Sequence, residues 1–286
     1  MTEPQTGLTI GYVPRTTAGG EARPDESTLA IVRYGLPAPS LLPEALTVSI
    51  PMPQFGDPTD EVWRVAEPVT RGEAGGVRFA RTGALLFGAV TLPQAPDEPL
   101  DERSRTAYRS ILSFVQGQGY PHLIRMWNFL PRINAEEGGL ERYQRFCVGR
   151  AEGFAAVFGD EEACRFPSAT AVGSMADDSL SIHFIAAVRE PRHVENPRQV
   201  SAYLYPRRYG PKSPSFARAT VPADGGPSRV YIAGTASIAG SESRHEGNLA
   251  AQYRETMANI DALVERTRGD EKAGLYKIYI RRETDY

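Results

Sequence analysis

Cysteine is scarce in this sequence of 286 residues, which contains only Cys147 and Cys164. Neither belongs to a CxxC motif, and neither is spaced with histidine as the ligands of a zinc site would be. The sequence therefore excludes a disulfide framework and a structural zinc site. We expect each cysteine to be a buried apolar thiol.

The signature motifs of several enzyme classes are also missing. The chain has no GxGxxG or P-loop motif for nucleotides and no HExxH motif for zinc. It has no GxSxG motif around a nucleophilic serine. The most similar stretch of sequence, GTASIAG at 234–240, has the wrong spacing between its glycines and its serine. The four histidines are isolated from one another, which is more typical of structural or exposed side chains than of metal ligands: His122, His183, His193 and His245. We therefore expect neither a metal nor an organic cofactor.

An excess of charge and a long hydrophobic run are absent as well. The formal net charge is −3, and the arginines are scattered among acidic residues. This pattern disfavours nucleic acid and membrane surfaces as partners. The N-terminus lacks the basic and apolar regions of a secretion signal, and no apolar run is long enough to span a bilayer. We expect a cytoplasmic protein whose partner is a small molecule.

The hydrophobic pattern predicts a mixed α+β fold. The composition is 41% hydrophobic, as in ordinary globular proteins, and the chain is long enough to bury a core. Alternating or continuous apolar stretches predict strands, and apolar residues three and four apart predict helices. The expected strands are 8–12, 29–34, 45–52, two within 77–92, 122–130, 181–188, 200–204, 229–238 and 275–281. The expected helices are 102–118, 139–157 and 248–268.

The order strand, helix, strand occurs twice, within 77–130 and within 229–281, which suggests an internal duplication of structure. We predict an N-terminal α+β domain at 1–138 and a C-terminal domain at 139–286. The first unit is followed by a further helix and strands, whereas the second unit ends shortly after its strand. We therefore expect the second domain to lack its last helix and strand.

An unusual loop is expected at 195–220. It is rich in proline, yet it carries three tyrosines and four arginines, and disordered linkers are poor in aromatic residues. Proline would stiffen such a loop, so that hydroxyl groups and guanidinium groups are held ready for a small anion. A plain surface loop with solvated arginines is the alternative.

Tyr143 and Arg150 are seven residues apart in the second predicted helix, so they share one face of it. That face is otherwise apolar, and a guanidinium there must find an anion or extend to solvent. The sequence leaves two interpretations open for Arg150: an ion pair with a protein carboxylate, or binding of a ligand.

Four blocks of the sequence, in this order, resemble the chorismatase family. They are RMWNFLPRIN at 125–134, ERYQRFCVGR at 141–150, YPRRYGPKSPSFARA at 205–219 and GTASIAG at 234–240. The resemblance extends over about residues 75–282. It implies a fold of two RidA-like (YjgF-like) strand–helix–strand units, packed as an N-terminal and a C-terminal domain in a monomer.

The resemblance also implies a reaction. Chorismatases remove pyruvate from chorismate, a dicarboxylate, by protonating its enol ether, and they release a hydroxybenzoate or a dihydroxycyclohexadiene carboxylate. It assigns the two carboxylate-binding groups to Arg150 and Arg218, and hydroxyl donors to Tyr143 and Tyr205. Gly234 stands at a product-determining position, where glycine resembles the members that form 3-hydroxybenzoate, with some 4-hydroxybenzoate.

One feature of the family does not match. Its catalytic acid is a glutamate in a final segment that resembles LLVEIE, which would lie beyond Tyr286, so no catalytic residue is assigned within this chain. We interpret the sequence as a shortened chorismatase. A catalytically silent protein that binds chorismate and a RidA-like imine hydrolase are the alternatives, and turnover of imino acids would identify the latter.

Overall fold

The computed structural model describes residues 7–15, 24–35, 45–93, 95, 97–159, 165–175, 179–223, 229–268, 274–281 and 284. Within these residues the fold is α+β, as the hydrophobic pattern predicts. No described helix is long and apolar enough to cross a membrane. Cys147 is buried and free, as expected, and Cys164 lies outside the described residues.

The N-terminal region forms a four-stranded sheet in the order β1-β4-β2-β3. Its strands are β1 (Thr9–Pro14), β2 (Thr28–Tyr34), β3 (Thr47–Ile50) and β4 (Thr59–Arg64). The β2 and β3 strands are parallel, and the other neighbours are antiparallel. The three strands expected at 8–12, 29–34 and 45–52 are confirmed. The pattern missed β4, whose buried Asp60 and Glu61 conceal its strand character.

A six-stranded sheet in the order β11-β8-β12-β7-β6-β5 forms the centre of the molecule. Its strands are β5 (Thr70–Ala74), β6 (Val77–Arg81), β7 (Leu85–Leu92), β8 (His122–Pro131), β11 (Ser168–Ser174) and β12 (Leu180–Ala187). The edge strand β11 is parallel to β8, and the other pairs are antiparallel. The expected strands within 77–92, at 122–130 and at 181–188 are confirmed, whereas β5 and β11 were not predicted.

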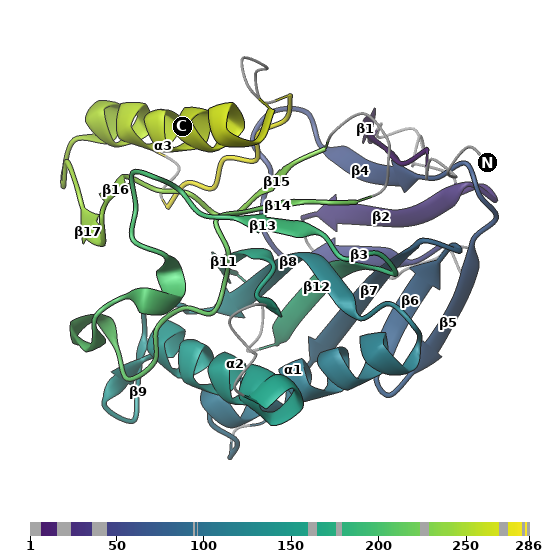
Figure 1. The fold of residues 1–286 in the computed structure, drawn as a ribbon, viewed down its shortest axis with the longest axis horizontal. Helices are drawn as coiled ribbons and strands as arrows, with labels where there is room; N and C mark the ends of the chain where they lie inside the picture. Colours follow the sequence, from purple (N-terminus) through teal and green to yellow (C-terminus); the bar gives the residue numbers. More distant parts are fainter. Residues whose placement is uncertain are drawn as a thin grey trace.

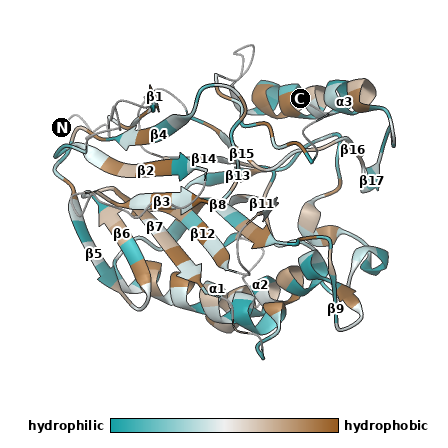
Figure 2. Ribbon diagram, turned by 180° about the vertical axis from the view of Figure 1, so that it is seen from behind, coloured by the Kyte–Doolittle hydropathy of each residue, from teal (hydrophilic) through white to brown (hydrophobic). Residues whose placement is uncertain are grey.

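Two helices cover one face of this sheet, and the N-terminal sheet lies on the other (Figure 1). They are α1 (Leu100–Gly117) and α2 (Arg142–Phe158), which begins after the short strands β9 (Glu136–Glu137) and β10 (Leu140–Glu141). Gly149 and Gly153 allow the two helices to pack closely, because a Cβ atom at either position would collide with α1. Apolar residues of the helices and of β7 and β12 face each other and form the larger core (Figure 2).

The C-terminal part carries β13 (Arg192–Val194), β14 (Ala219–Val221) and β15 (Tyr231–Ile232), which pair antiparallel. The hairpin of β16 (Ile238–Ala239) and β17 (Glu242–Ser243) leads to α3 (Leu249–Arg268). The Asn248 side chain accepts a hydrogen bond from the Ala251 amide and so caps the start of α3.

Two strand predictions in this part were wrong, and a third was right only in part. The stretch at 200–204 contains a 3-10 turn, η2 (Ala202–Leu204), because Pro206 follows it closely. The strand expected at 229–238 is limited to the two residues of β15, and residues 274–280 are irregular. A pleated pattern becomes a strand only where a neighbouring strand pairs with it, and none of the described strands pairs with residues 274–280.

Candidate active site

Arg150 is the most unusual charge in the structure. It lies on α2 and is 3% exposed. Its guanidinium carbon lies 5.1 Å from the ring centre of Tyr108 and 5.8 Å from that of Phe154. The Nε and Nη2 atoms have no hydrogen-bond partner, and no ion pair holds this guanidinium, among the described residues. A buried guanidinium without an anion is costly, so this site is suited to a ligand anion.

Tyr143 lies beside Arg150, as the helical spacing predicts. Burial raises the pKa of its hydroxyl well above the ordinary value, and the neighbouring Cys147 acts in the same direction. The positive charge of Arg150 acts against this rise, so the hydroxyl is within its electrostatic reach. Burial also raises the pKa of the Cys147 thiol to about 12, which makes it unreactive as a nucleophile. Tyr143 is therefore a neutral hydrogen-bonding group at neutral pH.

Arg218 and Tyr205 form a second pair, at the inner side of the loop. Arg218 is buried, and its Nη2 atom donates hydrogen bonds to the Tyr205 hydroxyl at 2.7 Å and to the Val200 carbonyl at 2.9 Å. Its Nε atom has no partner among the described residues. The rings of Tyr205 and Phe216 flank the guanidinium at 5.5 and 5.2 Å. Arg218 thus has a fixed position and a free donor.

The helix and the loop are joined by a hydrogen bond of 3.0 Å from the Gln144 side chain, next to Tyr143, to the Tyr209 carbonyl. Tyr143 and Phe216, which flanks Arg218, pack against the same hydrophobic core. The structure therefore places the two pairs on neighbouring elements, α2 and the loop at 195–220. Their roles toward a ligand remain predictions.

Glu195 lies beside Arg218 and was not singled out from the sequence. Its Oε1 atom accepts a weak hydrogen bond of 3.4 Å from the Arg218 amide, and its Oε2 atom is buried without a partner among the described residues. Burial raises the pKa of this carboxyl, while hydrogen bonds from Ser201 and Arg218 act against the rise. An acidic residue at the start of a loop rich in arginine is the signal that would have drawn attention to it.

Arg125 is a third buried guanidinium that sequence reasoning missed. It lies on β8, where its guanidinium carbon is 5.0 Å from the ring centre of Trp127. Its Nη2 atom donates to the Thr170 hydroxyl, and Nη1 donates to the Met126 carbonyl at 3.3 Å. Burial lowers its pKa to about 10, and the nearby charge of Arg150 contributes to this decrease. Arg125 begins the first of the four sequence blocks described above, which was the available signal.

Gly234 follows β15 and is exposed on one side. Its amide donates to the Ala169 carbonyl at 3.0 Å, which holds it against the edge strand β11. A Cβ atom at this position would lie 3.1 Å from Cγ2 and 3.2 Å from Oγ1 of Thr170. The space on that side of Gly234 is thus already filled by Thr170.

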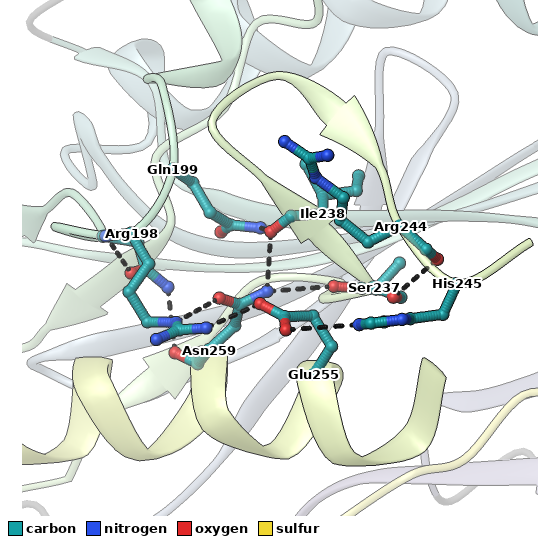
Figure 3. Close-up of polar contacts among 10 residues, drawn as sticks. Arg198, Gln199, Ser237, Ile238, Arg244, His245, Glu255 and Asn259 are labelled. Carbon is teal, nitrogen blue, oxygen red and sulfur yellow. Dashed lines mark hydrogen bonds and ion pairs between the residues drawn. The ribbon is translucent and has the colours of Figure 1, made fainter. Parts of the chain in front are cut away.

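A polar cluster holds the start of the loop against α3, as Figure 3 shows. Arg198 donates to the Asn259 side chain at 2.9 Å and forms an ion pair with Glu255 at 2.6 Å. The buried Asn259 amide donates to the carbonyls of Ala236 and Ile238 at 3.2 and 2.8 Å. These contacts therefore fix the start of the loop to α3 and to the segment around β16.

Comparisons with known proteins identify relatives of this chain. Residues 61–186 match the family model described as "Chorismatase FkbO/Hyg5-like, N-terminal". A 3-hydroxybenzoate synthase of Streptomyces hygroscopicus is 39% identical over 219 residues, which cover 73% of this chain and 62% of the relative. A chorismatase of the same species is 34% identical over 239 residues, which cover 79% of this chain and 67% of the relative.

A crystal structure of a chorismatase superposes with a TM-score of 0.82 at 28% sequence identity. The match covers 94% of this chain and 82% of that one. The chain spans about three fifths of the length of the 3-hydroxybenzoate synthase. The fold and the extent of sequence identity together show that this protein belongs to the chorismatase family.

Proposed function

We propose that this protein binds chorismate and cleaves it with release of pyruvate. The observation that carries the proposal is the pair of buried guanidinium groups, Arg150 and Arg218, which both have donors without a partner among the described residues. Burying an uncompensated guanidinium destabilises the free protein, and a bound carboxylate offsets that cost.

Chorismate has the matching chemistry, because it carries one carboxylate on its ring and one on its enolpyruvyl side chain. We assign one carboxylate to Arg150 and the other to Arg218, since planar guanidinium groups bind carboxylates well. Tyr143 remains protonated at neutral pH, so it donates to the ligand and adds no negative charge beside it.

Cleavage begins when a carboxylic acid protonates the methylene carbon of the enol ether, which becomes the methyl group of pyruvate. The resulting positive charge makes the ether oxygen a leaving group: a hydroxyl of the ring displaces it from the ring carbon and loses its proton, and pyruvate leaves with the ether oxygen. The ring portion then rearranges to a hydroxybenzoate. Pyruvate and a hydroxybenzoate together contain every atom of chorismate, so this outcome consumes neither water nor an oxidant. We propose 3-hydroxybenzoate as the main product, because a glycine stands at position 234. The proton donor is not assigned among residues 1–286.

We further propose that the fold consists of two RidA-like units and that the protein acts as a monomer. The support for two units is the repeated order of strand and helix, seen in β7, α1 and β8 and again in β15 and α3.

Glu195 favours a second candidate function, the binding of chorismate without turnover. It is the carboxyl group beside Arg218, and its Oε1 atom accepts a hydrogen bond from the Arg218 amide. A carboxyl group that fixes Arg218 in this way serves the binding of a carboxylate and needs no part in proton transfer.

The test is to incubate the purified protein with chorismate, to measure pyruvate by a coupled dehydrogenase assay, and to separate aromatic products by chromatography. Pyruvate with 3-hydroxybenzoate is the expected result. Saturable binding of chorismate without pyruvate would support the second candidate. Neither binding nor pyruvate would reject both.

A further inference from the structure

Thr170 occupies the space into which a side chain at position 234 would project. The distances of 3.1 and 3.2 Å to a Cβ atom there are shorter than ordinary van der Waals contacts, so one of the two residues would have to move. Gly234 cannot retreat easily, because its amide is bonded to the carbonyl of Ala169, the residue before Thr170.

Thr170 is also constrained on its other sides. It lies on the edge strand β11, where its carbonyl accepts a hydrogen bond of 2.9 Å from the Asn128 side chain. Its hydroxyl accepts a hydrogen bond from Arg125. The side chain is buried and closely packed, so a displacement of its methyl group also moves its hydroxyl and the Arg125 guanidinium that is bonded to this hydroxyl.

We infer that Thr170 is a specificity-determining residue that couples the size of residue 234 to the position of Arg125. This inference rests on the proposed function, because it concerns the wall of the site beside the ring of chorismate. A larger residue at position 234 changes the site by displacing Thr170 and Arg125. It does not need to fill an empty space beside the ring of the ligand.

Arg125 is near enough to the binding set for such a shift to affect a ligand. Asn128, which donates to the Thr170 carbonyl, accepts a hydrogen bond of 2.6 Å from the Tyr108 hydroxyl, and the ring centre of Tyr108 lies 5.1 Å from the guanidinium carbon of Arg150. On the other side, the amide of Ala233, the residue before Gly234, donates to the Arg218 carbonyl at 2.8 Å. A displaced Arg125 changes the positive potential around a bound dianion. The consequence is a change in how chorismate is oriented and in which product forms.

Three substitutions distinguish the effect of the Thr170 methyl group from the effect of its hydroxyl. Gly234→Ala introduces the clash. Thr170→Ser removes the methyl group and keeps the hydroxyl that Arg125 needs. Thr170→Val keeps the shape and removes the hydroxyl, which leaves a buried donor of Arg125 without an acceptor.

The experiment measures product ratio, chorismate affinity and thermal melting for wild type, G234A, T170S, G234A/T170S and T170V. We expect G234A and T170V each to weaken chorismate binding by about fivefold and to shift the product ratio in the same direction. T170S should resemble wild type. G234A/T170S lacks the closer contact, at 3.1 Å from Cγ2, but keeps the one at 3.2 Å from Oγ1, so it should recover part of the affinity that G234A loses. Thr82→Val, at a buried threonine that caps a turn between β6 and β7, controls for general destabilisation and should leave the product ratio unchanged.

A double variant that behaves like G234A, or a T170V protein with the product ratio of wild type, would overturn the inference. If the wild-type protein binds chorismate without turnover, no product ratio can be measured, and the chorismate affinities of the variants decide the inference. A wild-type protein that does not bind chorismate rejects the proposed function. In that case the melting temperatures still decide whether residues 234 and 170 are coupled, and additive effects would reject the coupling as well.

Discussion

The Nη2 atom of Arg218 donates a hydrogen bond of 2.7 Å to the hydroxyl oxygen of Tyr205, within a loop that is stiffened by proline. This bond fixes a charged group that would otherwise have several rotamers, so that it meets a carboxylate with little further loss of entropy.

Tyr205→Phe tests this positioning. It removes the acceptor and leaves the ring, so Arg218 loses a charge-assisted hydrogen bond and becomes more mobile. We expect chorismate affinity, measured by titration calorimetry, to fall about tenfold. Tyr209→Phe is the matched control, because the Tyr209 hydroxyl accepts only an exposed hydrogen bond of 3.2 Å from Arg208 in the same loop. Equal affinities for the Y205F variant and the wild-type protein would contradict the assignment.

Arg150→Met should separate stability from binding. Methionine fills a similar volume without a charge, so we expect the free energy of unfolding of the ligand-free protein to rise by about 1–2 kcal/mol. Chorismate binding should be lost. Denaturant unfolding and calorimetry measure the two effects.

Arg142→Met is the control for this substitution. Arg142 is equally buried on α2, but it forms an ion pair of 2.8 Å with Glu137. Its replacement should therefore lower the free energy of unfolding by about 3 kcal/mol, because a carboxylate loses its partner. If both variants lose stability to the same extent, Arg150 is a structural residue and its assignment to a ligand is wrong.

Asn259→Ala should release the loop from α3. The buried side chain of Asn259 bonds two carbonyls and the exposed Arg198, and its removal breaks all three hydrogen bonds. We expect the free energy of unfolding to fall by about 3 kcal/mol. Gln252→Ala, on an exposed part of the same helix, removes one hydrogen bond of 3.0 Å to His245 and should have little effect. Similar losses in the two variants would show that the cluster does not hold the loop.

Glu195 makes stability depend on pH. Burial raises the pKa of its carboxyl above the ordinary value of 4.5, so the folded state holds this proton more tightly than the unfolded state does. The stabilisation from the neutral form is complete below pH 4.5 and is lost as pH rises through the folded pKa. Glu195→Gln does not titrate, so its melting temperature should exceed that of wild type increasingly as pH rises to about 7. A difference that stays constant with pH would contradict this.

The sequence predicted those parts of the fold whose pattern is local. The α1 helix repeats its apolar residues with helical spacing, and the alternating β6 and the continuous apolar run of β7 lie on either side of a turn. The edge strand β5 has only polar and small residues, so its pairing with β6 could not be recognised. The strand pattern at 275–281 was misleading, because an isolated strand pattern carries no information about its partner.

The site residues likewise divide into those that a local pattern predicts and those that depend on contacts between distant parts of the sequence. The shared face of Tyr143 and Arg150 follows from their spacing along one helix. The contact between Arg125 and Thr170 depends on the parallel pairing of β8 with β11, which brings together residues 45 apart in sequence. No local pattern predicts such a contact. The absence of a carboxylate near Arg150, among the residues that the structure describes, likewise became visible only in the structure.

The central claim is that Arg150 and Arg218 bind the two carboxylates of one chorismate molecule. The most direct test is calorimetric titration of chorismate into the wild-type protein and into R218A. We predict saturable binding to wild type with one chorismate per chain, and a loss of more than about tenfold in affinity for R218A. Unchanged affinity in R218A, or no binding to wild type, would contradict the account.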